Sequence, residues 1–311
     1  MSTDTLRHSV FVYDSDDELA SRMVPFLAAG LDADELVAIV AAPPHRALLE
    51  DALGDGSDDV AFFDPLEHYT RPEAALAGYD AALRRVVAGG AKTIRMFAEM
   101  PFDFRDEALP GDRWMAYEAI FNRAFAHHPL WLACSYDRQT TPEPIVETLL
   151  RTHPEIFDDG WRRPRPSEHY TDAASVVRDL TPAPRPLPEL AELELVEDPL
   201  RLRRMLAATM RNAGVADTAA SDLLVATGEI VANARRHGGG LRRIRAGRVN
   251  GHFVCELSDG GPGHDDPLAG FTPPRDSASC AGLWIARQLS DDVELISDPG
   301  GLTARLWASA G

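Results

Sequence analysis

Short apolar runs alternate with longer segments of helical periodicity through the first half of this chain, and this alternation restricts the folds open to it. Strands are predicted at residues 9–13, 36–41, 60–63, 93–97 and 130–136, with helices at 16–30, 46–53, 72–88 and 114–125. Strands that alternate with helices pair in parallel, and helices cover both faces of the sheet. Residues 1–158 are therefore predicted to form an α/β domain with a mainly parallel sheet.

The chain has a single lysine, Lys92, and the residue before it is Ala91. A phosphate-binding P-loop needs its lysine directly after a glycine, at a fixed spacing from an earlier one. The first domain therefore has no P-loop, and ATP chemistry is expected only in the second half of the chain.

Composition limits the partners and the setting of the protein. The 311 residues suffice for two domains, and 49 acidic against 31 basic residues give a formal net charge of -18. Such a charge repels phosphates, so direct nucleic acid binding is not expected. There is no signal-type leader and no run near twenty apolar residues, so we expect a cytoplasmic protein without a membrane span. Cys134, Cys255 and Cys280 are too few and too scattered to suggest a disulfide framework or a metal set.

Residues 159–188 are rich in proline and read as a linker. Closely spaced prolines favour an extended, semi-rigid tether, and a short helix is predicted within it at 172–180. Such a tether suits a sensor that regulates an output domain by contact.

In the second half, residues 219–236 have helical periodicity and end at a run of glycines from Gly238. Glu229 and Asn233 are four residues apart, so they lie on one face of this helix. An amide oxygen suits Mg²⁺, and a carboxylate one turn away can orient or deprotonate an attacking hydroxyl. His237 follows one turn later, where a histidine also suits the helix dipole.

A strand at 253–257 leads into Asp259, Gly260, Gly261 and Gly263. Glycines allow a ligand to approach the backbone closely. A carboxylate at a strand end can accept a hydrogen bond from the exocyclic amine of adenine, so Asp259 is the candidate residue for recognising adenine.

These motifs, followed by Ala281-Gly282-Leu283 at the start of another helix, resemble the GHKL ATPase superfamily, and within it the anti-sigma-factor serine/threonine kinases. The resemblance covers residues 189–311 and implies a GHKL (Bergerat) α/β sandwich with a final hairpin. It implies ATP and Mg²⁺ as cofactors, Glu229 as the catalytic residue and Asn233 as the metal ligand. The residues it implies for nucleotide binding are Asn233, Asp259, Gly261, Gly263, Gly282, Leu283 and Thr303, the last of them near adenine.

One departure from the superfamily is Cys280, which stands where its second glycine box begins with glycine. If that position needs a positive φ, a cysteine is strained there, so nucleotide binding is expected to survive better than turnover. Residues 264–279 are rich in proline and glycine and read as a mobile lid. Arg275 and Arg287 are the available cations for phosphate, although Arg287 fits a solvated helix face equally well.

The first domain resembles the MEDS sensory domain over residues 5–155, a family similar to a RecA-like core without its P-loop. The resemblance rests on His8, Tyr13 with the acidic run 14–18, Tyr117-Glu118 with Asn122, and residues 134–137. It implies that the domain senses a small molecule of unknown identity. Candidate pocket residues are His8, Tyr13, Glu99, Glu118, Tyr136 and Asp137, at strand ends or on facing helices. Each also has a structural explanation, such as pairing of Glu118 with Arg113 or Arg123.

Taken together, the resemblances imply an anti-sigma factor and ATP-dependent serine/threonine kinase of bacterial partner switching. Its expected partners are a sigma factor and an anti-sigma-factor antagonist with a STAS fold, and kinases of this type commonly form homodimers through the ATPase domain. Two alternatives remain open. One is a nucleotide-binding regulatory module without turnover, and the other is a histidine-kinase-like signalling protein, for which the sequence shows no phosphoacceptor histidine.

Overall fold

A computed structural model describes residues 6–106, 109, 111–157, 162, 164–196, 198–272 and 281–310. The chain divides into two compact units, Met1–Thr181 and Pro182–Gly311. The residues predicted to form the linker are shared between them. None of the helices in the described ranges is long and apolar enough to cross a membrane.

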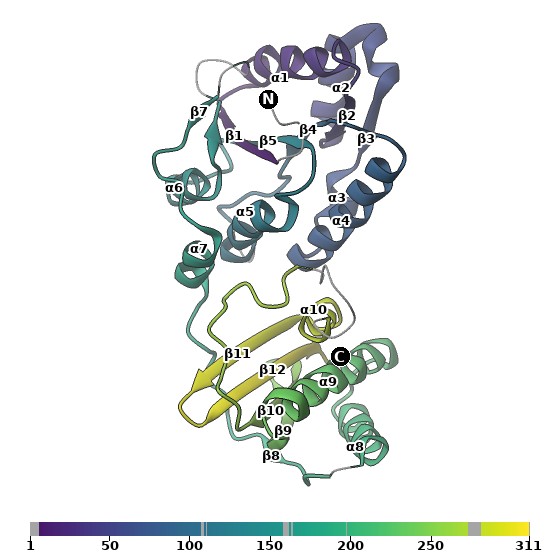
Figure 1. The fold of residues 1–311 in the computed structure, drawn as a ribbon, viewed down its shortest axis with the longest axis vertical. Helices are drawn as coiled ribbons and strands as arrows, with labels where there is room; N and C mark the ends of the chain where they lie inside the picture. The colour runs from purple at the N-terminus through teal and green to yellow at the C-terminus, as the bar shows by residue number, and fades with distance from the viewer. Residues whose placement is uncertain are drawn as a thin grey trace. The chain divides into compact units, whose positions relative to one another are not determined.

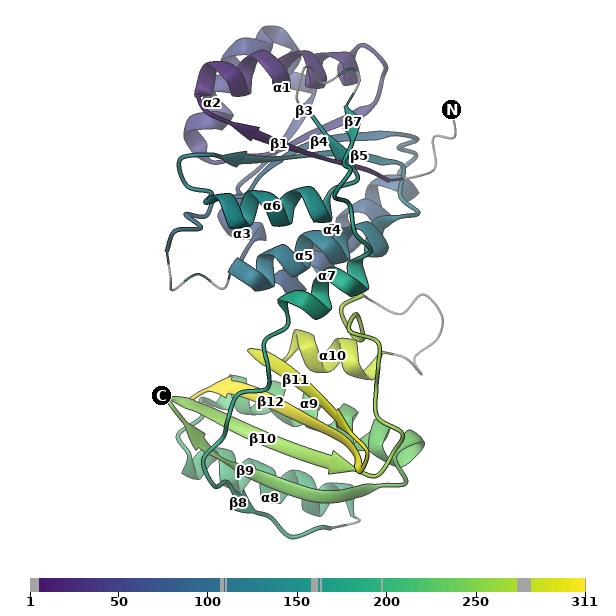
Figure 2. The same cartoon turned by 90° about the vertical axis from the view of Figure 1, so that its left-hand side faces the viewer.

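The first unit is a sheet with helices on both faces (Figure 2). Its strands have the order β3-β2-β4-β5-β1-β6-β7, and every pairing in it is parallel except that of β6 with β7. The strands are β1 (Arg7–Tyr13), β2 (Leu36–Val40), β3 (Val60–Phe63), β4 (Ile94–Glu99), β5 (Leu130–Asp137), β6 (Glu155–Ile156) and β7 (Arg165–Pro166). The helices are α1 (Asp16–Leu31), α2 (Pro43–Leu53), α3 (Pro65–His68), α4 (Pro72–Ala88), α5 (Gly111–Phe125), α6 (Glu143–Thr152) and α7 (Ala173–Leu180), with a 3₁₀ turn at Gly54–Asp59.

Helix α1 shows how the sequence produces these elements. Ser15 caps it by accepting a hydrogen bond from the backbone N–H of Glu18, and three acidic residues occupy the first turn, where the helix dipole favours negative charge. Leu19, Met23 and Phe26 recur at helical spacing and are fully buried against the sheet. Figure 2 shows α1 and α2 on one face and α4, α5 and α6 on the other.

The second unit is a two-layer sandwich of an antiparallel sheet and helices (Figure 1). The strand order is β11-β12-β10-β9-β8, and α8, α9 and α10 cover one face. The elements are β8 (Ala191–Glu192), α8 (Pro199–Asn212), α9 (Asp217–His237), β9 (Leu241–Val249), β10 (His252–Asp259), α10 (Gly282–Gln288), β11 (Asp292–Asp298) and β12 (Gly301–Ser309).

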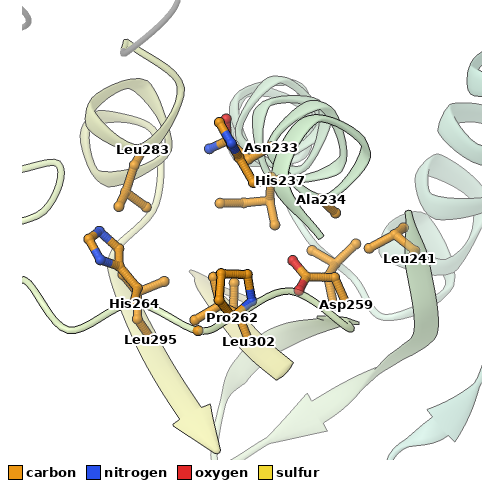
Figure 3. A pocket seen from close by; sticks show the side chains of 14 residues that line it. Asn233, Ala234, His237, Leu241, Asp259, Pro262, His264, Leu283, Leu295 and Leu302 are labelled. Atoms are coloured by element: carbon orange, nitrogen blue, oxygen red, sulfur yellow. The ribbon is translucent and has the colours of Figure 1, made fainter. Parts of the chain in front are cut away.

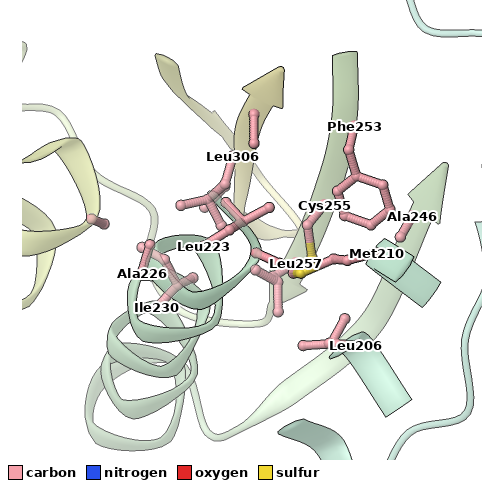
Figure 4. Packing of buried hydrophobic residues seen from close by; sticks show 14 of the residues in the cluster. Leu206, Met210, Leu223, Ala226, Ile230, Ala246, Phe253, Cys255, Leu257 and Leu306 are labelled. Carbon is pink, nitrogen blue, oxygen red and sulfur yellow. The ribbon is translucent and has the colours of Figure 1, made fainter. Parts of the chain in front are cut away.

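The core of this second unit lies between α9 and the centre of the sheet (Figure 4). Phe253, Cys255 and Leu257 alternate along β10, so their side chains share the face that meets the helices. Leu223 and Ile230 of α9 pack against this face. The core therefore holds α9 on the sheet and fixes the orientation of the helix face that carries Asn233.

The predicted fold class is confirmed in both halves: a mainly parallel sheet flanked by helices, and an antiparallel sheet with helices on one face. Two helices, α6 and α8, occupy segments for which no boundaries were predicted. Both begin next to a proline and have few buried residues: Val146, Leu149 and Thr152 in α6, and Leu202, Leu206 and Met210 in α8. Both carry apolar residues at helical spacing, so the sequence held a signal for these helices from which no limits were predicted.

Candidate nucleotide and sensor sites

A cavity of about 380 Å³ opens in the second unit between α9, the loop after β10, α10 and the final hairpin (Figure 3). Its walls combine aliphatic side chains with a few polar groups, the usual makeup of a small-molecule site. The lining residues are Ile230, Asn233, Ala234, His237, Leu241, Leu257, Asp259, Pro262, Gly263, His264, Leu283, Leu295, Leu302 and Ala304.

Helix α9 brings Asn233 to the cavity and Glu229 to its margin. The two side chains share one helix face, as their spacing predicts, and both are partly buried. Asn233 lines the cavity, whereas Glu229 lies beside the first residue of α10.

Gly282, the first residue of α10, lies close to both polar side chains of α9. A Cβ atom placed on Gly282 would lie 2.9 Å from Glu229 Oε2 and 3.2 Å from Asn233 Nδ2. Any larger residue would displace one of these two polar side chains. The glycine therefore allows the beginning of α10 to meet Glu229 and Asn233 directly.

Asp259 lies at the end of β10, on the far side of the cavity from Leu283 (Figure 3). Its Oδ1 accepts a hydrogen bond of 2.8 Å from the backbone N–H of Gly261, which holds the turn. A Cβ on Gly238 would lie 2.6 Å from the same Oδ1, so the end of α9 must be glycine for Asp259 to occupy this place. A carboxylate fixed in this way offers an acceptor to a ligand in the cavity.

The structure corrects the prediction for Thr303. Its neighbours on β12, Leu302 and Ala304, line the cavity, and alternation along a strand directs Thr303 to the opposite face. There its hydroxyl hydrogen-bonds to Ser258 Oγ at 2.9 Å. Leu302 therefore takes the place at the cavity wall that was predicted for Thr303.

Arg287 does not lie on a solvated helix face, one of the two roles predicted for it. It is 8% exposed, its Nε donates to the carbonyl of Ala269 at 2.9 Å, and its guanidinium lies 3.8 Å from the ring centroid of Phe271. The arginine thus ties α10 to the segment after the glycine bend. Arg275 and Cys280, with most of the second half of the predicted lid, lie outside the described residues.

Polar groups in the first unit form two separate clusters, and the first is at the carboxyl ends of the strands. Glu99, the last residue of β4, accepts hydrogen bonds from the Tyr13 hydroxyl at 3.4 Å and from the backbone N–H of Ala42 at 3.1 Å. His45 Nδ1 lies 2.7 Å from Glu99 Oε1, and its Nε2 lies 3.2 Å from Asp16. The hydrogen bond to Glu99 raises the pKa of His45 to about 9 despite partial burial. Burial and the nearby Glu99 raise the pKa of Tyr13 far above its usual range.

The second cluster surrounds Glu118 inside the unit. The Tyr136 hydroxyl donates to Glu118 Oε1 at 2.6 Å, and His8 Nε2 lies 3.3 Å from Glu118 Oε2. Burial alone would raise the pKa of Glu118, but hydrogen bonds from His8 and the Tyr136 hydroxyl outweigh it and lower the pKa. Burial lowers the pKa of His153 to about 3, so this imidazole is neutral.

Family comparisons assign both units. The family described as "MEDS: MEthanogen/methylotroph, DcmR Sensory domain" matches residues 7–154, and the family described as "Histidine kinase-like ATPase domain" matches residues 193–307. The chain joins a MEDS domain to a histidine-kinase-like ATPase domain. No curated protein matches the chain. The protein is therefore a regulatory, ATP-binding signalling protein of the kinase-like type.

The cavity of the ATPase domain fits the nucleotide that its family implies. Apolar side chains such as Leu257 and Leu302 can cover the faces of a base, while Asp259 supplies an acceptor for an exocyclic amine. Asn233 supplies a neutral oxygen suited to a hard cation beside phosphates. Of the residues predicted to bind nucleotide, the cavity thus brings together Asn233, Asp259, Gly263 and Leu283. Gly261 and Gly282 are not among the lining residues. Gly261 donates a backbone hydrogen bond to Asp259, and Gly282 lies beside Asn233.

Sequence reasoning missed several contributors. His264 lines the ATPase cavity and is held by Ser297, whose Oγ accepts from the His264 N–H and donates to its carbonyl. In the MEDS domain, His45 and His153 join the predicted clusters. Asp137 accepts a hydrogen bond from the backbone N–H of Gln139, and its charge helps to raise the pKa of Tyr13. A proline-flanked histidine such as His153 gives no signal of its own, because its partners are far away in sequence.

Proposed function

We propose that this chain is an anti-sigma factor and ATP-dependent serine/threonine kinase of a partner-switching pathway, regulated by its MEDS domain. Its substrate would be a serine or threonine of an anti-sigma-factor antagonist with a STAS fold, and its captive partner a sigma factor. The observation that carries the proposal is the meeting of Glu229, Asn233 and Asp259 around one cavity of a histidine-kinase-like ATPase domain.

Each polar residue of the cavity has a distinct part in this proposal. Asp259 would accept a hydrogen bond from the adenine amine through its carboxylate, whose orientation the Gly261 N–H fixes. Asn233 would hold Mg²⁺ through its amide oxygen. Gly282 keeps Asn233 and Glu229 within reach of the beginning of α10.

Glu229 is the candidate general base for phosphoryl transfer. Its carboxylate lies one helical turn from Asn233 and could accept the proton of a partner hydroxyl. ATP would supply the transferable phosphoryl group, and transfer depends mainly on positioning and charge neutralisation. The structure positions this carboxylate at the margin of the cavity, where a hydroxyl from another protein could approach.

Incubation of the full chain with ATP labelled in the γ-phosphate and candidate STAS-fold antagonists tests the proposal. We expect acid-stable label on a serine or threonine of one antagonist, and its loss in Glu229→Gln. Glu189→Gln is the matched control, because Glu189 is exposed and lies outside the cavity lining. A chain that captures sigma factor and retains nucleotide without transfer would be a binding module. Acid-labile label on the chain itself would indicate a histidine kinase.

A further inference from the structure

The Glu118 cluster in the MEDS domain also contains a cysteine and a second histidine. His8, Glu118, Cys134 and His153 are all buried, the most exposed being Cys134 at 5%. They come from β1, α5, β5 and the residue after α6, and one potential ligand atom from each lies within 4.8 Å of the other three. We propose that these four side chains form a closed binding site for a divalent first-row metal ion, best suited to Zn²⁺.

Four of the six distances between the ligand atoms are close to those of a tetrahedral zinc site, and all six are within 4.8 Å. His8 Nε2 lies 3.3 Å from both Glu118 Oε2 and Cys134 Sγ. Glu118 Oε2 lies 3.5 Å from His153 Nε2 and 3.9 Å from Cys134 Sγ. Zinc bonds of about 2.0–2.3 Å at tetrahedral angles separate neighbouring ligand atoms by about 3.3–3.8 Å. The cluster therefore needs little rearrangement to hold the ion.

The hydrogen bonds around the cluster direct lone pairs toward its centre. Asn122 Nδ2 donates to the carbonyl of Thr152, so its Oδ1 is the acceptor for His8 Nδ1–H at 3.0 Å. His153 Nδ1–H donates to the carbonyl of Leu149 at 2.9 Å. Both imidazoles therefore turn an Nε2 lone pair inward, the arrangement in which outer hydrogen bonds fix metal-binding histidines.

Inside the cluster, acceptors outnumber donors. Two Nε2 lone pairs and a carboxylate oxygen face each other, and the Cys134 thiol offers one proton between them. His153 Nε2 is buried and has no hydrogen-bond partner among the described residues. A proton on His8 Nε2 would form a hydrogen bond to Glu118, but His153 Nε2 would still have no hydrogen-bond partner among the described residues. A metal ion satisfies all four groups at once, with Cys134 releasing its proton to solvent on binding.

Four protein ligands in a buried site leave no open coordination position, so the site is structural or regulatory and has no catalytic water. Because the ligands come from two strands and two helical segments, the ion would bind these elements together. Its loss would loosen the sheet from α5 and the end of α6. This inference concerns the MEDS domain alone and does not depend on the proposed kinase activity.

Metal analysis of the untagged full chain, expressed with added zinc and passed over a chelating resin, is the first test. We expect one zinc per chain, resistant to the resin. Asn122→Ala, which removes the partner of His8, should weaken zinc binding about 10–100-fold. A chain that retains no zinc and takes up none on titration would overturn the proposal.

Cobalt substitution identifies the ligands. The chain has three cysteines, so Cys255→Ala with Cys280→Ala leaves Cys134 as the only thiol. In this background Co²⁺ should give a near-ultraviolet thiolate charge-transfer band and the strong visible bands of tetrahedral cobalt. Adding Cys134→Ser should remove the charge-transfer band. If that triple variant does not fold, the spectrum of the Cys134-only chain decides, because absence of the charge-transfer band there refutes coordination by Cys134.

Discussion

At the scale of single residues, Asn233 is where the ATPase cavity can be tested most directly. Asn233→Ala removes the amide oxygen proposed to hold Mg²⁺ and keeps the helix, since alanine is the best helix former. We expect ATP affinity in the presence of Mg²⁺ to fall at least tenfold, about 1.4 kcal/mol, measured by calorimetric titration. The matched control is Asn212→Ala at the exposed end of α8, which should leave the affinity unchanged. Equal affinities for Asn233→Ala and the native chain would remove Asn233 from the site.

The pair formed by His45 and Glu99 predicts a pH dependence of the MEDS domain. The folded pKa of His45 is about 9, above its ordinary value of 6.5, because Glu99 and Asp16 favour the charged ring. The stabilising contribution is therefore fully present below about pH 6.5 and is lost as the pH rises through about 9. We expect the contribution to be on the order of 1 kcal/mol, after allowance for the solvent that reaches the pair.

Urea unfolding of the native chain and of His45→Gln checks this prediction, because glutamine keeps a polar side chain without the charge. The difference in free energy of unfolding between the two proteins should be largest near pH 6 and should shrink toward zero above pH 9. The titration of Tyr13, whose hydroxyl also contacts Glu99, lies above this range. A difference that is constant with pH would show that folding leaves the pKa of His45 unchanged.

Residue spacing predicted part of the geometry of the candidate site. Glu229 and Asn233 lie together because four residues make one helical turn, a rule local to the helix. Thr303 was wrong by one position, because a shift of one residue on a strand reverses the face and only tertiary structure fixes it. The four residues of the buried MEDS cluster lie at positions 8, 118, 134 and 153, so no spacing motif could have revealed them.

At the scale of elements, Gly228 in α9 and Gly282 at the start of α10 differ in what an added side chain would meet. Gly228 is exposed in the middle of α9, and a Cβ there would meet nothing within 4 Å. Gly228→Ala should therefore stabilise the ATPase domain by about 0.5–1 kcal/mol, through helix propensity alone. Gly282→Ala should instead disturb the contact of α10 with Glu229 and Asn233 and lower ATP affinity.

Comparing the two variants separates folding from binding. Thermal unfolding should show Gly228→Ala at or above the stability of the native chain, and ATP titration should find its affinity unchanged. Gly282→Ala should remain folded with weaker nucleotide binding. Native ATP affinity in Gly282→Ala would show that α10 does not need its close contact with α9.

The elements themselves were predictable where their apolar pattern was strong. Strands β2, β4 and β5 of the MEDS domain are mostly buried on both faces and are rich in apolar residues, and α9 has an apolar residue on nearly every turn. Helices α6 and α8 also carry apolar residues at helical spacing, such as Val146 with Leu149 and Leu202 with Leu206, although no limits were predicted for them. Arg287 had no such signal, because its anchoring contacts come from Ala269 and Phe271, which sequence alone could not bring near it.

At the scale of the whole molecule, each unit has its own buried core and its own sheet, so we predict two unfolding transitions in calorimetry. ATP with Mg²⁺ binds only the folded ATPase domain, and at a hundredfold excess over Kd it stabilises that domain by about 2.7 kcal/mol. One transition should therefore rise on the order of 10 °C while the other stays in place. Asn233→Ala assigns the moving transition, because the same ATP concentration should shift it much less. If both transitions rise with ATP, the stabilities of the two domains are coupled, and a signal sensed by the MEDS domain could then reach the ATPase cavity through this coupling.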